Sequence, residues 1–170
     1  MKQQLNHITH ASIPIFINDK SSVLILGSLP SVKSRECGFY YGHKMNRFFP
    51  TLSRVFDDKE PITIEERKEF LNRHNIALYD VIYECDIYGS SDSSIKNPIV
   101  IDIEDILKRY PNIKTIGTNG GKAKSLFDKY LLPKISDKDI RVIYLPSSSP
   151  ANAKMKIDDL VKEYKKLFVI

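Results

Sequence analysis

Three polar side chains that could hold a water molecule, a phosphate or another anion lie close together in the sequence, namely His43, Asn46 and Arg47. Apolar residues with helix-like spacing follow them, which predicts a helix over residues 46–56 with this cluster at its N-terminus. A helix N-terminus offers unpaired N–H groups and positive potential, and both favour anions. Asn46 is therefore the first candidate for chemistry, and an ordinary helix N-cap is the alternative role for its side chain.

An apolar run just upstream, residues 23–26, would position this cluster. The sequence Val-Leu-Ile-Leu closed by Gly27 is typical of a strand buried on both faces of a parallel sheet, and α/β proteins bind ligands in the loops after such strands. Gly27 permits a close approach of the backbone to a ligand, and Pro30 stiffens the loop. The aromatic residues 39–41 that follow either cover the edge of the sheet or offer a ring for stacking.

The rest of the chain alternates between apolar and amphipathic segments, which predicts strands and helices in turn. Strands are expected over residues 76–83, 113–117 and 141–145, and helices over residues 63–74, 102–109, 122–131 and 155–168. This order predicts an α/β fold with three layers, α/β/α, around a central, mainly parallel, four-stranded sheet. Its ligand crevice would lie at the C-terminal ends of the strands. From the length of 170 residues, a single domain over residues 1–170 is expected.

Polar residues also occur where the other strands end, so they would reach the same crevice. Asp80 is a lone carboxylate in an apolar strand, and because burying it without a donor costs several kcal/mol, it either accepts a structural hydrogen bond or reads a ligand. Thr-Asn-Gly-Gly-Lys-Ala at residues 118–123 lacks the spacing of a P-loop, which favours a tight structural turn. Residues 146–153 form a stiff loop of small residues that could bond phosphates or serve only as a connector.

The composition of the chain narrows its possible partners and cofactors. The net charge of +5 permits binding to a phosphate backbone but does not demand it. The two cysteines, Cys37 and Cys85, argue against a disulfide scaffold and a four-cysteine iron–sulfur cluster. His7 and His10 lack a third nearby metal ligand, so residues 1–20 are expected to form an ordered arm. No apolar run approaches a membrane span and no signal-peptide core is present, so we expect a cytoplasmic protein without a cofactor or metal.

Two segments around the first candidate site carry the motif of a known enzyme family. Residues 24–31 read L-I-L-G-S-L-P-S, and residues 40–49 read Y-Y-G-H-K-M-N-R-F-F. They resemble the L-I-L-G-S-L-P-G and Y-Y-x-H-P-x-N-R-F-W segments of the hypoxanthine (deoxyinosine) DNA glycosylase branch of the uracil-DNA glycosylase superfamily. Residues 89–97 and 145–153 match two further segments of that family in the same order. The chain departs from the motif at Ser31, Lys44 and Phe49, where the family has Gly, Pro and Trp.

The resemblance implies a monofunctional DNA glycosylase that hydrolyses the N-glycosidic bond of a deaminated base, with hypoxanthine favoured, after the nucleotide has swung out of the duplex. Negative charge builds on the departing base of such a reaction, so a placed water and hydrogen-bond donors are needed. Asn46 would be the catalytic residue and would orient the attacking water through its amide oxygen. Relatives with a G-I-N-P-G motif carry a water-holding Asn where this chain has Leu29, which argues against robust uracil excision.

The resemblance also implies which residues contact the base and the DNA. The implied base-binding residues are Gly27, Ser28, Leu29, Pro30, Tyr40, Tyr41 and Asp80. Tyr41 or Tyr40 would stack on the base, and Asp80 would accept the N1–H of hypoxanthine. The implied DNA-binding residues are Arg47, Ser147, Ser148, Ser149 and Asn152. Residues 89–97 would be an ordered piece near the site or a flexible loop, and the expected partner of a monomeric protein is double-stranded or single-stranded DNA.

Other functions remain open at the level of sequence. A protein of the same fold could bind nucleic acid without catalysis, as the basic charge and the departures at Lys44 and Phe49 would allow. A hydrolase of free nucleosides or nucleotides could also use this fold. A uracil-preferring glycosylase is the nearest alternative, since it differs only in the base.

Overall fold

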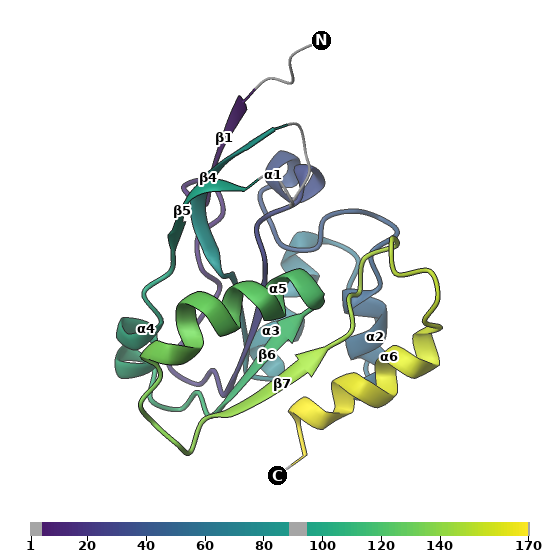
Figure 1. Ribbon diagram of the computed structural model, residues 1–170. Coiled ribbons are helices and arrows are strands. Elements are labelled where there is room, and N and C mark those ends of the chain that lie inside the picture. The colour runs from purple at the N-terminus through teal and green to yellow at the C-terminus, as the bar shows by residue number, and fades with distance from the viewer. Residues whose placement is uncertain (1–4, 89–94, 170) are drawn as a thin grey trace.

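The computed structural model describes residues 5–88 and 95–169 (Figure 1). Its centre is a four-stranded parallel sheet in the order β3-β2-β6-β7. The strands are β2 (Val23–Gly27), β3 (Ile76–Asp80), β6 (Thr115–Asn119) and β7 (Arg141–Leu145). Helices cover both faces of this sheet, so the predicted three-layer α/β/α fold is confirmed.

The helices follow the predicted order, with one addition and small shifts at their ends. They are α1 (Val32–Cys37), α2 (Phe48–Val55), α3 (Ile64–Arg73), α4 (Ile103–Arg109), α5 (Gly121–Leu126) and α6 (Ile157–Tyr164). A π-helical turn and a 3-10 turn extend α5, and a 3-10 turn extends α6, over Phe127–Leu131, Leu132–Lys134 and Lys165–Leu167. The addition is α1, which the sequence analysis does not predict.

Strand β2 separates two hydrophobic cores, because successive side chains of a strand point to opposite faces of a sheet. Leu24 and Leu26 belong to the core that α4 and α5 cover. Val23 and Ile25 belong to the core that α2, α3 and α6 cover. All of β2 is buried, as its apolar run predicts. The loop that follows β2 therefore starts from a position that both cores hold in place.

A second sheet, which the sequence analysis misses, packs beside the first. It is antiparallel, in the order β1-β4-β5, with strands β1 (Leu5–Thr9), β4 (Ile82–Tyr88) and β5 (Lys96–Val100). The single strand predicted over residues 76–83 is wrong, because the chain leaves the parallel sheet after Asp80 and enters the antiparallel sheet at Ile82. At this change of sheet, the N–H groups of Val81 and Ile82 still bond the carbonyls of Gly27 and Ser28.

Strand β4 continues to Tyr88, so the polar residues that follow the predicted strand form part of a sheet. Cys85 and Ile87 are buried, whereas the carboxylates of Glu84 and Asp86 lie on the other face and bond the imidazole of His7 at 2.9 Å each. His7 thus belongs to a cross-strand pair rather than a metal site, and the expected N-terminal arm contains a strand. Of the family segment at residues 89–97, residues 89–94 lie outside the described part of the chain.

Candidate functional site

A pocket of about 580 Å³ lies at the C-terminal ends of the parallel strands, where the sequence analysis expects the ligand crevice. The loops after β2, β6 and β7 line it, together with α1 and the end of β3. Its volume is within the range of small-molecule sites in proteins. Asn46, Tyr41 and the serines at 147–149 all border this pocket, although they are far apart in the sequence. The fold therefore brings together the amide of Asn46, the ring of Tyr41 and the loop of residues 146–153, which is called the serine loop below.

The side chain of Asn46 is held by hydrogen bonds that link α2 to the loops after β6 and β7. Its Oδ1 accepts the backbone N–H of Phe48 and the hydroxyl of Ser148, both at 2.9 Å. Asn119 donates from Nδ2 to the Ser148 hydroxyl and accepts the Ser148 N–H at Oδ1, both at 3.0 Å. Because a backbone N–H can only donate, the N–H groups of Phe48 and Ser148 fix which atom of each amide is the oxygen.

This arrangement changes the chemistry that Asn46 can offer. Its amide oxygen already accepts two hydrogen bonds, as many as a carbonyl oxygen has lone pairs, so this arrangement leaves it no free lone pair for a water. The expected contact from this oxygen to a water stays a prediction. Its Nδ2 makes no hydrogen bond within residues 5–88 and 95–169. Asn46 therefore presents a donor to the pocket. The predicted helix begins at Phe48 rather than at Asn46, and its N-cap residue is Arg47. Asn46 is therefore not the N-cap, although its side chain accepts the first N–H of the helix, that of Phe48.

Asn119 is a pocket residue that the sequence analysis misses. The analysis assigns residues 118–123 to a structural turn, because the pair of glycines there does not have P-loop spacing. Gly120 has a φ of 98°, and a Cβ at this position would lie 3.1 Å from the Cβ of Ser147. This close approach brings the loop after β6 against the serine loop. The available signal was the position of Asn119 directly at the end of a buried strand, which matches the position of Gly27 in β2.

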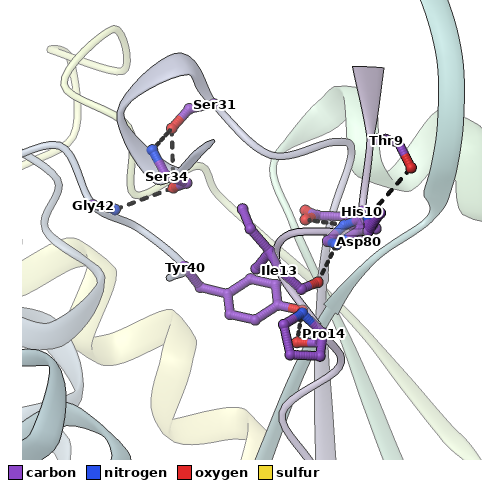
Figure 2. Close-up of polar contacts among 10 residues, drawn as sticks. Thr9, His10, Ile13, Pro14, Ser31, Ser34, Tyr40, Gly42 and Asp80 are labelled. Atoms are coloured by element: carbon purple, nitrogen blue, oxygen red, sulfur yellow. Dashed lines mark hydrogen bonds and ion pairs between the residues drawn. The ribbon is translucent and has the colours of Figure 1, made fainter. Parts of the chain in front are cut away.

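The two candidate stacking tyrosines differ in their surroundings. Tyr40 borders the pocket but is only 3% exposed, and its hydroxyl donates to the carbonyl of Pro14 at 3.0 Å, so its ring is fixed in the hydrophobic core (Figure 2). Tyr41 is half-buried and stacks on Phe48 with ring centroids 3.9 Å apart. Burial, and then the nearby charge of Asp80, raise the pKa of Tyr41 well above its usual value of 10, so its phenol is neutral. Tyr41 is the better placed of the two for contact with a base.

Asp80 lies at the pocket with its two oxygens in different surroundings. The residue is 5% exposed, and its Oδ2 lies 2.8 Å from Nε2 of the buried His10 (Figure 2). Its Oδ1 packs over Gly27, where an added Cβ would come within 2.3 Å of it. This oxygen has no hydrogen-bond partner in the described part of the chain. Both alternatives for Asp80 are thus compatible with its geometry, since Oδ2 accepts a structural bond while Oδ1 remains available to a ligand.

Arg47 and Asn152 hold the serine loop in shape. The guanidinium of Arg47 donates to the carbonyls of Met155 and of Asn152, the latter at 2.8 Å. The Asn152 side chain donates from Nδ2 to the carbonyl of Ser147 at 3.0 Å. These two bonds use two of the five N–H donors of the guanidinium, so Arg47 has a structural role here, and the expected DNA contact through its remaining donors stays a prediction. Ser148 is 1% exposed and serves Asn46, whereas the half-buried Ser147 and Ser149 remain at the pocket.

Comparison with known proteins places this chain in a family, although no family model matches it. The chain is 33% identical over 111 residues to the hypoxanthine DNA glycosylase of Methanosarcina barkeri, and the match covers 65% of this chain and 70% of that protein. The chain belongs to the hypoxanthine DNA glycosylase family. A second hypoxanthine DNA glycosylase, from Methanosarcina acetivorans, is 29% identical over 140 residues, which are 82% of this chain and 85% of that protein.

The fold agrees with this family and with its place in the uracil-DNA glycosylase superfamily. A solution NMR structure of a proposed uracil DNA glycosylase from Methanosarcina acetivorans superposes with a TM-score of 0.76 at 26% identity. The superposition covers 92% of this chain and 97% of that one. The resemblance inferred from the sequence motifs is therefore confirmed.

The positions at which this chain departs from the hypoxanthine DNA glycosylase motif have local structural roles. Ser31 caps α1, because its hydroxyl accepts the N–H of Ser34 at 3.1 Å. Lys44 is exposed. Phe49 is 2% exposed, and the guanidinium of Arg67 lies 4.8 Å from the centroid of its ring. These departures leave Asn46 and its hydrogen bonds in place.

The described part of this glycosylase-family chain contains neither a group of metal-binding side chains nor a helix that could span a membrane. Within residues 5–88 and 95–169, no three His, Cys, Asp or Glu side chains are grouped so that they could hold a metal ion. None of the helices in these same residues has the length and apolar character needed to cross a membrane.

Proposed function

We propose that this protein hydrolyses the N-glycosidic bond of hypoxanthine in DNA, acting on a nucleotide that has rotated out of the duplex into the pocket. The observation that carries the proposal is the convergence, in a single pocket, of the Asn46 amide and the free oxygen of Asp80. The family relatives, which are named hypoxanthine DNA glycosylases, support the same activity. The protein would act as a DNA repair enzyme, as a single domain and a monomer.

Negative charge would develop on the departing base during the reaction, and the protein would have to stabilise it. Water adds to C1′ of the sugar, the C1′–N9 bond breaks, and its electron pair leaves with the base, which then takes up a proton. The Nδ2 of Asn46 is a donor that can stabilise this developing negative charge or hold the oxygen of the water. Phe48 begins α2, and the positive end of that helix lies beside Asn46 and adds to the effect. The chain would thus catalyse the reaction by positioning and by preorganised donors.

Recognition of the base would come from the first loop and from Asp80. The Oδ1 of Asp80 would accept the N1–H of hypoxanthine, and Tyr41 would stack on the ring, a contact worth about 1–3 kcal/mol. The backbone of Gly27–Pro30 would approach the base closely, with Ser28 and Leu29 at the wall of the pocket. Since uracil also offers a single N–H between ring atoms, at N3, a uracil-preferring enzyme is the second candidate, and the superposed structure is a reason to test it.

A panel of DNA duplexes that differ in one base tests this function. Duplexes with hypoxanthine, uracil, xanthine or an alkylated base in one sequence context would be assayed for abasic sites under single-turnover conditions. We expect the fastest cleavage at hypoxanthine. Salt-sensitive binding without cleavage of any base would favour a catalytically inactive nucleic-acid-binding module. Turnover of free inosine at a rate similar to that of the duplex would favour a nucleoside hydrolase.

Arg35 is the side chain that we propose as a further ligand of the DNA backbone, beside Arg47. It lies in the last turn of α1 and lines the pocket. Its guanidinium makes no hydrogen bond or ion pair within residues 5–88 and 95–169, and its Nε is buried without a partner. A guanidinium with free donors matches the geometry of phosphate oxygens. Ser147 and Ser149 would add smaller contacts to the same backbone.

Arg35→Ala is expected to weaken DNA binding uniformly across sequences and to reduce the slope of log K against log salt by about 1, because one phosphate contact is lost. The measurement is a salt titration of binding by fluorescence anisotropy. The matched control is Arg109→Ala, which removes the same charge from an exposed pair with Asp105 on α4. Equal slopes for the two variants would contradict the assignment of Arg35.

A further inference from the structure

His10 lies behind the pocket and has no role in the chemistry proposed above. The residue is 1% exposed and follows β1, far in the sequence from Asp80. Three tyrosine rings surround its imidazole, with centroid distances of 6.0 Å to Tyr40, 4.8 Å to Tyr79 and 6.3 Å to Tyr83. This packing, together with hydrogen bonds from both ring nitrogens, fixes the orientation of the imidazole.

The partners of His10 determine where its hydrogens lie. The carbonyl oxygen of Ile13 can only accept, so Nδ1 of His10, 2.8 Å away, carries a hydrogen (Figure 2). One proton then lies between Nε2 and Oδ2 of Asp80. If it is on nitrogen, the pair is an imidazolium and a carboxylate; if it is on Oδ2, the pair is a neutral imidazole and a carboxylic acid. In both arrangements Oδ1 of Asp80 carries no hydrogen, so it is an acceptor.

We propose that His10 is a positioning residue that makes the pocket select hypoxanthine over guanine and adenine, an inference that rests on the proposed function. His10 engages one oxygen of Asp80 and leaves the other, Oδ1, as a single acceptor over Gly27. Hypoxanthine offers one N–H donor, at N1, on the edge that meets this acceptor. Guanine adds an amino group at C2, which matches a carboxylate with two free oxygens. Adenine has an acceptor at N1, which faces Oδ1 unfavourably.

A pocket that acts on hypoxanthine must reject guanine and adenine, because these undamaged bases are abundant in DNA. Guanine differs from hypoxanthine only by the amino group, and a hydrophobic wall alone rejects a closely similar ligand weakly. A site that leaves a polar group of the wrong base unpaired rejects it much more strongly. With Oδ2 held by His10, the amino group of guanine finds no second carboxylate oxygen. The cost of this selectivity is a buried histidine that must keep its partner.

Two amide substitutions separate the two hydrogen bonds of His10. In His10→Gln the side-chain amide reaches the position of Nε2 and can still donate to Asp80. In His10→Asn the amide reaches only the position of Nδ1 and can bond Ile13 but not Asp80. Both variants would be assayed beside the wild-type protein for single-turnover cleavage at hypoxanthine, guanine and adenine in one sequence context, and both would be checked by thermal unfolding.

We expect His10→Gln to keep the wild-type preference and His10→Asn to lower the ratio of hypoxanthine to guanine cleavage by about 10-fold or more. The same ratio in both variants overturns the role of His10 while leaving the proposed function intact. Absence of cleavage at hypoxanthine by the wild-type protein would instead remove the proposed function. If His10→Asn does not fold, a wild-type assay on 1-methylhypoxanthine, which lacks the N1–H, decides. Undiminished cleavage there overturns the proposal, and loss of cleavage supports it.

Discussion

Asn46→Asp is expected to lower the single-turnover rate of hypoxanthine excision by roughly 10²–10³-fold, the loss typical of a donor that stabilises developing negative charge. The carboxylate keeps one oxygen for the Phe48 N–H and the Ser148 hydroxyl, so the local structure is preserved. The Nδ2 of Asn46, an N–H donor, is replaced by the second carboxylate oxygen, a charged acceptor. This acceptor repels the negative charge that builds on the departing base.

This substitution distinguishes two roles of Asn46 that a change to alanine would not separate. If Asn46 oriented water through an acceptor, as the resemblance to the family implies, a carboxylate would serve at least as well. An Asn46→Asp protein that retains a third or more of the wild-type rate would therefore contradict the donor role. Binding to the hypoxanthine duplex and the thermal unfolding midpoint are the controls, because both should change far less than the rate.

The meeting of several loops in one pocket could be predicted because each strand of the parallel sheet is recognisable in its local sequence. The apolar run that becomes β2 is buried on both faces, and Gly27 follows it directly. Parallel strands bring their C-terminal ends to one edge of a sheet, so the expectation that Asn46 and the serine loop share one crevice followed from the alternation of strands and helices. Those inferences needed no knowledge of how individual side chains are oriented.

The parts that could not be predicted depend on partners distant in sequence. Glu84 and Asp86 give β4 the appearance of a polar loop, and only the pairing with β1, which brings His7 to them, makes it a strand. The Phe48 N–H fixes which atom of the Asn46 amide is the oxygen, but the second bond to that oxygen comes from Ser148, which Asn119 orients. The periodicity of either local segment contains no information about these contacts.

Gly27→Ala is expected to lower the single-turnover rate at hypoxanthine by roughly 100-fold, the cost of misplacing a reacting geometry by about 1 Å. The added Cβ would lie 2.3 Å from Oδ1 of Asp80, so the carboxylate must move from its place at the pocket. The control is a double-mutant cycle with Asp80→Ala, which removes the atom that the Cβ would meet. If Gly27 acts through Asp80, the double variant is no slower than Asp80→Ala alone. Additive losses would contradict this, because they would mean that the glycine is needed for the approach of the base itself.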